Sequence, residues 1–132
     1  MVGKLCTAGA VRGMDFAGTV VALGRKVTTA ANIQVGDRVC SAAQGMYALT
    51  PLVGEFAQFV GASDVRTLKI LHLLSFEKGT SLGIAVGTIS LALFKSLEVP
   101  GMPESPARDP KTVLVYGGST ATGTPAIQLF KL

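Results

Sequence analysis

The sequence has no tryptophan, one histidine and two cysteines among its 132 residues, and only 15% of them are charged. Cys6 and Cys40 are too few for a disulfide framework and lack the paired spacing of a zinc site. A reduced, cytoplasmic compartment is therefore expected. The 12 basic residues are scattered singly, and only two tyrosines and six phenylalanines are available for base stacking. We therefore expect no nucleic-acid binding.

Long hydrophobic runs are also missing. The longest, residues 82–94, spans 13 positions and is interrupted by glycine, threonine and serine. Because a membrane-crossing helix needs about 20 apolar residues, this run predicts a buried helix and no membrane partner. The N-terminus has no apolar core long enough for a signal peptide. Hydrophobic residues (48%) and glycine (16 positions) are abundant instead, as in globular proteins rich in buried sheet.

Short β-branched runs bounded by glycines predict strands in the first half of the chain. Residues 15–24 form the first, and a Gly-Asp turn within 34–40 precedes the second. Residues 54–60 alternate apolar and polar positions and predict a third strand, and the apolar stretch 66–74 predicts a fourth. Strands at this spacing favour a small, mostly antiparallel, barrel-like domain.

Helices and a loop are predicted in the second half. Ser75 is typical of a helix N-cap, and the apolar positions of 82–97 predict one long buried helix. Four prolines and five charged residues in 98–111 predict an exposed, extended loop. The last segment, 112–132, begins with a β-branched run that predicts a buried parallel strand at 113–116, and continues into apolar positions of helical spacing.

A turn of small residues lies between the β-branched run at 113–116 and the apolar positions of the expected helix. It consists of Gly117, Gly118, Ser119, Thr120, Ala121, Thr122 and Gly123. A strand, such a turn and a helix open the dinucleotide-binding βαβ unit, in which main-chain N–H groups at the helix N-terminus hold a pyrophosphate. The pattern Gly117-x-x-Thr120-x-x-Gly123 is close to G-x-x-G-x-x-G, but its middle position is threonine instead of glycine. An ordinary strand-to-helix turn is the alternative interpretation. Pro125 falls about one turn into the expected helix, where it would distort the helix start.

Taken in order, these motifs resemble the medium-chain dehydrogenase/reductase superfamily. The resemblance covers roughly residues 13–132 and includes Val35-Gly-Asp-Arg-Val39, Gly54-Glu-Phe-Ala57 and the glycine-rich turn. The run 115–122 is similar to that of fungal trans-acting enoyl reductases of lovastatin-type polyketide pathways, which depart from the glycine pattern in the same way. The resemblance implies a mixed α/β fold: a partial GroES-like, β-rich catalytic domain followed by the first βα unit of a Rossmann domain.

The implied boundaries are a partial GroES-like catalytic domain at 1–81, a connecting helix at 82–97, a proline-rich loop at 98–111 and a truncated Rossmann domain from 112 to 132. The first strands of the family's catalytic domain have no counterpart ahead of Gly13, and most of the cofactor domain is missing. We therefore expect an internal fragment of a longer enzyme, or a truncated gene product.

The resemblance also implies an activity. Such an enzyme is NADPH-dependent and reduces an α,β-unsaturated thioester on the acyl carrier of a partner polyketide synthase, as part of secondary metabolism and toxin biosynthesis. By the same resemblance, cofactor phosphate would meet Ser119, Thr120, Ala121 and Thr122. Simple N-capping is the alternative role for Ser119 and Thr122. By the resemblance, the acyl chain would contact a helical stretch made of Ile89, Ser90, Leu91, Ala92, Leu93, Phe94, Lys95 and Ser96. The alternative is that this apolar helix only packs in the core.

Zinc-dependent relatives place a histidine ligand in a Gly-His-Glu motif, where this chain has Gly13-Met14-Asp15. Because methionine is a poor zinc ligand and His72, the only histidine, lies in an apolar stretch as an expected strand-end residue, we expect no metal site. Two further functions stay open: a quinone oxidoreductase-like alkene reductase, and a catalytically dead remnant with at most a docking role. No catalytic residue is assigned. The chain alone is not expected to turn over substrate, because positioning for attack needs both domains closed on the cofactor.

Overall fold

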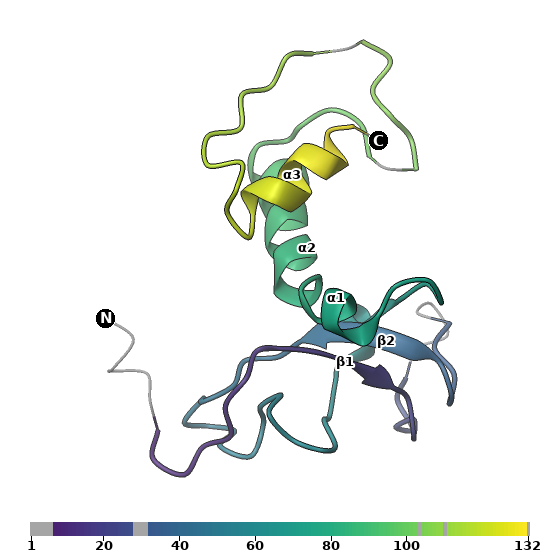
Figure 1. The fold of residues 1–132 in the computed structure, drawn as a ribbon, viewed down its shortest axis with the longest axis vertical. Coiled ribbons are helices and arrows are strands. Elements are labelled where there is room, and N and C mark those ends of the chain that lie inside the picture. The colour runs from purple at the N-terminus through teal and green to yellow at the C-terminus, as the bar shows by residue number, and fades with distance from the viewer. Residues whose placement is uncertain (1–6, 28–31, 103, 110, 132) are drawn as a thin grey trace. The chain divides into compact units, whose positions relative to one another are not determined.

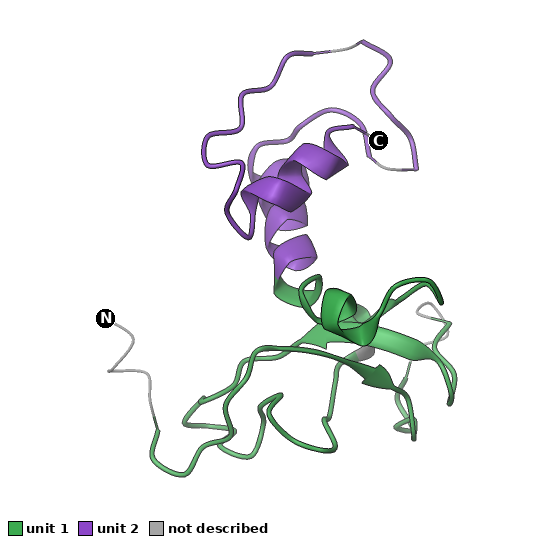
Figure 2. Cartoon of the chain, in the orientation of Figure 1, with its two compact units in different colours: residues 1–84 green, residues 85–132 purple. Residues whose placement is uncertain are grey.

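The computed structural model of the chain describes residues 7–27, 32–102, 104–109 and 111–131. Cys6 lies outside the described residues, so the expectation of reduced cysteines bears on Cys40, which is a free and buried thiol. The chain divides into two compact units, residues 1–84 and 85–132 (Figure 2).

Unit 1 is built on a three-stranded antiparallel sheet in the order β1-β2-β3. Its strands are β1 (Asp15–Thr19), β2 (Arg38–Ala42) and β3 (Leu68–Lys69). The Gly-Asp turn predicted ahead of the second strand is confirmed. Gly36 has a φ of +93°, which glycine adopts without strain. The Asp37 carboxylate accepts a hydrogen bond from the Gln34 backbone N–H at 2.7 Å, which closes the turn.

The strand predicted at 54–60 is wrong, and the one predicted at 66–74 is confirmed only over two residues. Residues 54–60 bend repeatedly and form no ladder with any described part of the chain. Their phenylalanines, Phe56 and Phe59, would point to opposite faces of a strand, and both are largely exposed, so no neighbouring element covers either ring. The stretch 66–74 contributes only the two residues of β3, between the short 3-10 helix η3 (Asp64–Arg66) and a turn. The first predicted strand also ends early, at Thr19.

Helix α1 (Phe76–Thr80) packs against β1 and β2 (Figure 1). The predicted N-cap is confirmed, because the Ser75 hydroxyl accepts a hydrogen bond from the Lys78 backbone N–H at 3.4 Å. This bond satisfies one of the N–H groups that the first turn of a helix leaves without a partner.

Arg38 fixes the turn that leads into α1. Its guanidinium donates hydrogen bonds to three carbonyl oxygens, at 3.1, 3.0 and 2.7 Å, those of Leu71, His72 and Leu74. The same group lies 4.3 Å from the centre of the Phe76 ring, at a distance that gives a cation–π contact. His72 is therefore an exposed turn residue rather than the end of a strand.

Glu55 is buried in unit 1, with 6% of its surface exposed. Neither of its side-chain oxygens has a hydrogen-bond partner among the described residues. Burial and, secondarily, the nearby Asp15 charge raise the pKa of this carboxyl group to about 6. The Asp15 carboxylate has a partner of its own, since it accepts a hydrogen bond from the Ile84 backbone N–H at 2.6 Å. Glu55 is thus a carboxyl group held in a site that disfavours its charge.

Stability is expected to fall as the pH rises from about 4.5 to about 6.5. Because the pKa of Glu55 is higher in the folded chain than in the unfolded chain, the folded state binds more protons in this window and loses stability as they leave. The loss is about 1 kcal/mol after allowance for solvent screening. Urea unfolding across this pH range checks the expectation. Glu55→Gln should flatten that part of the pH profile, and a variant with an unchanged slope would contradict the assignment.

Unit 2 contains most of helix α2 (Gly83–Ser90), the π-helical turn η4 (Leu91–Ser96) and helix α3 (Gly123–Leu129). The long helix predicted at 82–97 is confirmed in position. Its last turns widen, as shown by the Leu97 N–H, which donates to the carbonyl oxygen of Ala92, five residues earlier, at 2.9 Å. The core of the unit joins this helix to α3 through the buried residues Ile89, Leu93 and Ala126.

The long helix is less buried than predicted. Of α2 and η4, only Ile89 and Leu93 are buried, and Leu91 and Leu97 are exposed. The helical stretch Phe76–Ser96 has 21 residues, more than the apolar run seen in the sequence, and contains an 18-residue window with a mean hydropathy of 1.2. Its length and composition would suffice to cross a membrane. A single stretch of this kind decides little, because core helices of soluble proteins have the same properties.

The strand predicted at 113–116 is also wrong, because it pairs with no described segment of the chain. Its side chains are largely uncovered: Leu114 is 90% exposed and Tyr116 is fully exposed. Only Val115 packs against the core of unit 2. The proline-rich stretch 98–111 is the loop that was expected, closed near its start by an isolated bridge between Met102 and Ser105.

Candidate functional site

The glycine-rich turn is a tight structure in which glycine is needed at two positions, 117 and 123. Gly117 has a φ of +81°, in the left-handed region that favours glycine. A Cβ atom added to Gly118 would lie 2.9 Å from Cδ1 of Ile127, the end of a flexible side chain that can move away. A Cβ atom at Gly123 would overlap the carbonyl oxygen of Gly117 and lie 3.0 Å from Cα of Gly118. The backbone before the turn therefore lies directly against the start of α3.

Thr120 holds this turn together. Its hydroxyl donates to the carbonyl oxygen of Gly117 at 2.8 Å and accepts from the Gly123 N–H at 3.0 Å. Its backbone N–H also donates to the Gly117 carbonyl, at 2.9 Å. Thr124 adds a further bond, from its hydroxyl to the carbonyl oxygen of Gly118 at 3.0 Å. The threonine that interrupts the glycine spacing is thus a structural residue of the turn.

Three backbone N–H groups of the turn, those of Ser119, Ala121 and Thr122, have no hydrogen-bond partner among the described residues. Thr122 occupies the N-cap position of α3 but makes no side-chain capping bond, and its hydroxyl lies 3.5 Å from that of Thr120. The four predicted phosphate contacts are exposed together. The N-capping alternative for Ser119 and Thr122 finds no support in these contacts.

Pro125 does not distort the helix as expected. Helix α3 begins at Gly123, so Pro125 lies in its first turn. N–H groups in this turn have no intrahelical acceptor, so the missing donor of proline costs nothing there. The short α3 therefore starts cleanly from the turn, and the N–H groups of Gly123 and Thr124 bond to the hydroxyl and the carbonyl oxygen of Thr120.

The eight residues predicted to contact the acyl chain have different environments. Ile89 and Leu93 are buried against Ala126, and Ala92 and Phe94 pack around them. Exposed positions in this stretch are Leu91, Lys95 and Ser96, and Ser90 is half-buried. Core packing thus accounts for part of this stretch. The exposed residues of the stretch are the ones that could contact a ligand.

A cavity of about 630 Å³ in unit 2 lies at the end of this helix. Leu93 and Phe94 line it, together with residues of the proline-rich loop and Phe130. None of the residues 119–122 lines it. The structure therefore does not place the two predicted residue sets in one cavity. Among the described residues no group of three or more His, Cys, Asp or Glu side chains could hold a metal ion.

In sequence, the chain is similar to proteins from fungi. It is 64% identical over its full length to a trans-enoyl reductase of Gibberella zeae. Trans-enoyl reductases of Fusarium heterosporum and Talaromyces variabilis are 54% and 45% identical, over 100% and 99% of the chain. The chain spans 37%, 37% and 36% of these three proteins, little more than a third of their length. No family model matches it.

Structure comparison agrees with these relatives. A crystal structure of an alcohol dehydrogenase superfamily protein from Novosphingobium aromaticivorans matches 98% of the chain with a TM-score of 0.70 and 29% identity, and the match covers 36% of that protein. The resemblance to fungal trans-enoyl reductases within this superfamily is therefore confirmed, as is a mixed fold of helices and sheet.

Proposed function

We propose that this chain is a segment of an NADPH-dependent trans-acting enoyl reductase that works with a polyketide synthase. Its similarity to trans-enoyl reductases over the whole chain, at up to 64% identity, is the observation that carries the proposal. The proposed architecture is a partial GroES-like catalytic domain at 1–81, the helix at 82–97, the loop at 98–111 and the start of a Rossmann domain at 112–132. A cytoplasmic location and a metal-free site complete the proposal.

The glycine-rich turn fits the pyrophosphate of a dinucleotide. Its partnerless N–H groups at Ser119, Ala121 and Thr122 are exposed at the start of α3, where the helix dipole favours negative charge. The close packing at Gly123 keeps side chains out of the way of the backbone. When bound, the nicotinamide would supply the hydride for the β-carbon of the unsaturated thioester. The turn itself would only bind and orient the cofactor.

A cofactor titration of the purified 132-residue chain tests this assignment. Cofactor fluorescence should show saturable binding of NADPH, with weaker binding of NADH as the control. A folded chain that binds neither nucleotide would contradict a working phosphate site in this turn. For the longer parent enzyme, turnover of a carrier-bound enoyl thioester would support the proposal, and turnover of free quinones alone would favour a quinone oxidoreductase-like enzyme.

Two single substitutions should separate binding from folding within the turn. Thr120→Val removes the hydroxyl that bonds to Gly117 and Gly123, and it should lower the free energy of unfolding by about 1 kcal/mol. Ser119→Ala removes an exposed hydroxyl with no partner among the described residues, so it should leave stability unchanged and weaken NADPH binding. Thermal unfolding and the fluorescence titration measure the two effects. Equal stability losses in both variants would contradict the division of roles.

A further inference from the structure

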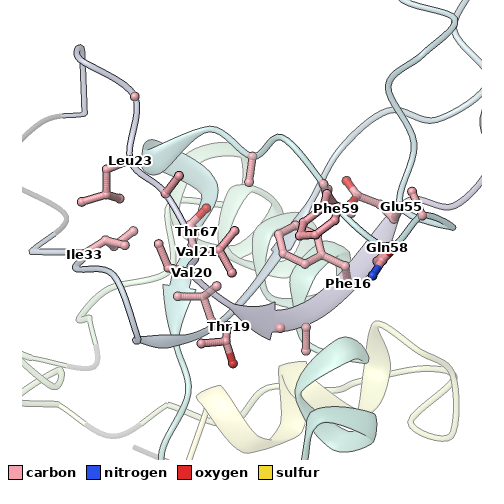
Figure 3. A pocket seen from close by; sticks show the side chains of 18 of the residues that line it. Phe16, Thr19, Val20, Val21, Leu23, Ile33, Glu55, Gln58, Phe59 and Thr67 are labelled. Atoms are coloured by element: carbon pink, nitrogen blue, oxygen red, sulfur yellow. The ribbon is translucent and has the colours of Figure 1, made fainter.

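Unit 1 contains a cavity of its own, between β1 with the chain that follows it and the segment 54–60 (Figure 3). Its volume is about 320 Å³, within the range of pockets that hold small molecules. Most of its wall is apolar and includes Phe16, Val20, Val21, Leu23, Ile33 and Phe59. This wall would accommodate an aliphatic chain, but it does not by itself select a ligand.

Glu55 is the residue that would decide which kind of ligand the cavity binds. It lines the cavity, is 6% exposed, and has no hydrogen-bond partner for either carboxyl oxygen among the described residues. In Figure 3 it lies with Gln58, Phe16 and Phe59 at one end of the cavity, whereas Leu23 and Ile33 lie at the other end. A buried acceptor of this kind is normally satisfied, so its partner is expected from outside the described chain.

The charges around Glu55 indicate that its partner is positively charged. Asp15 is close enough to act on the Glu55 carboxyl by charge, so two acidic groups share this part of the unit. The described residues contain one ion pair, between Lys69 and Asp37, and it leaves Glu55 without a cation. The faces of aromatic rings attract cations as well. An anionic ligand such as a nucleotide phosphate would instead be repelled.

We propose that the cavity of unit 1 binds an organic cation consisting of a primary ammonium group on a short apolar chain. On binding, the Glu55 carboxylate, whose oxygens are closed to solvent in the free chain, turns toward the cavity and accepts hydrogen bonds from the ammonium group, and the apolar chain lies among Val20, Val21 and Leu23. The cavity lies in unit 1 and the glycine-rich turn in unit 2, so this site does not rest on the proposed reductase function.

Hexylammonium chloride is the probe that tests the proposal, with hexan-1-ol as its neutral counterpart. Titrated into the ¹⁵N-labelled full chain near pH 7.5, hexylammonium should give saturable shifts of the amides in 16–24 and 54–60. It should bind on the order of tenfold more tightly than the alcohol, as expected for one charge-assisted contact. Its affinity should fall near pH 5, where Glu55 takes up a proton.

Matched variants make the test specific. Glu55→Gln should weaken hexylammonium binding about tenfold and leave hexan-1-ol binding unchanged. Glu104→Gln, which alters an exposed carboxylate in unit 2, should change neither. Val21→Phe should fill the cavity and abolish binding of both compounds while Glu55 remains in place. The dispersion of the amide spectrum shows whether Glu55→Gln folds. If it does not fold, Val21→Phe tests whether the compounds bind in this cavity.

Three results would overturn the proposal. The first is the absence of saturable hexylammonium binding to the folded chain. The second is equal affinity for the ammonium compound and the alcohol, or an affinity that Glu55→Gln does not change. The third is binding whose amide shifts lie outside 16–24 and 54–60, or binding that survives Val21→Phe.

Discussion

Replacing Gly123 by alanine is expected to abolish NADPH binding and to lower the free energy of unfolding by about 3 kcal/mol. The added methyl group would overlap the carbonyl oxygen of Gly117 and lie 2.9 Å from its carbonyl carbon. These neighbours are backbone atoms, so no side-chain rotation can relieve the overlap. The turn would have to open, and opening breaks the hydrogen bonds of Thr120 to Gly117 and Gly123. Fluorescence titration and urea unfolding measure the two losses.

Gly87 provides the matched control for this substitution. It lies in α2, and a Cβ atom added there meets no atom within 4 Å. Gly87→Ala should therefore raise the free energy of unfolding by about 0.5–1 kcal/mol, through the higher helix propensity of alanine, and leave cofactor binding intact. Wild-type NADPH affinity in Gly123→Ala would show that the cofactor does not use this turn.

The features that the sequence predicted correctly are local ones. The Ser75 cap depends on residues three positions apart, and the turn at Gly36 and Asp37 depends on one positive φ and one short hydrogen bond. The helix over 82–97 follows from its own run of apolar side chains, which has the length of a helix rather than of a strand. Each of these needs no information about distant parts of the chain.

Most of the wrong predictions concern strands, since a strand needs a neighbour at hydrogen-bonding distance. The β-branched run at 113–116 has strand propensity but no pairing partner among the described residues, and Leu114 stays 90% exposed. Residues 54–60 have the alternation of a strand, yet Phe56 and Phe59 are exposed. Propensity and alternation describe which surface a segment could pack on, and they do not say whether that surface is present.

The candidate site was predicted only where it depends on neighbouring residues in the sequence. Residues 119–122 are neighbours in the sequence, so their grouping at the start of α3 follows from the turn itself. The bonding of Thr120 to both Gly117 and Gly123 was missed, although a threonine three residues from each glycine was a visible signal. Glu55 was missed altogether, because the alternation of 54–60 does not show which charged residue lacks a partner.

Replacing Arg38 by methionine is expected to destabilise unit 1 by about 3 kcal/mol. Methionine keeps much of the apolar contact with Phe76 but leaves three carbonyl oxygens, those of Leu71, His72 and Leu74, without their donor. Arg38→Lys should recover less than half of this loss, because a single ammonium group cannot reach three carbonyls in the fork geometry of a guanidinium.

Urea unfolding at a fixed pH measures these losses, with a shift in midpoint at constant slope. Arg25→Met is the control, because Arg25 is exposed in a turn and has no hydrogen-bond partner among the described residues, and it should change the free energy of unfolding by less than about 0.5 kcal/mol. If Arg38→Met were as stable as Arg25→Met, the turn 71–74 would be held by the packing of α1 on the sheet. If Arg38→Lys matched the wild type, charge alone would explain the contribution of Arg38. A large loss in both Arg38 variants, with Arg25→Met unchanged, would show that the geometry of the guanidinium joins β2 to the start of α1.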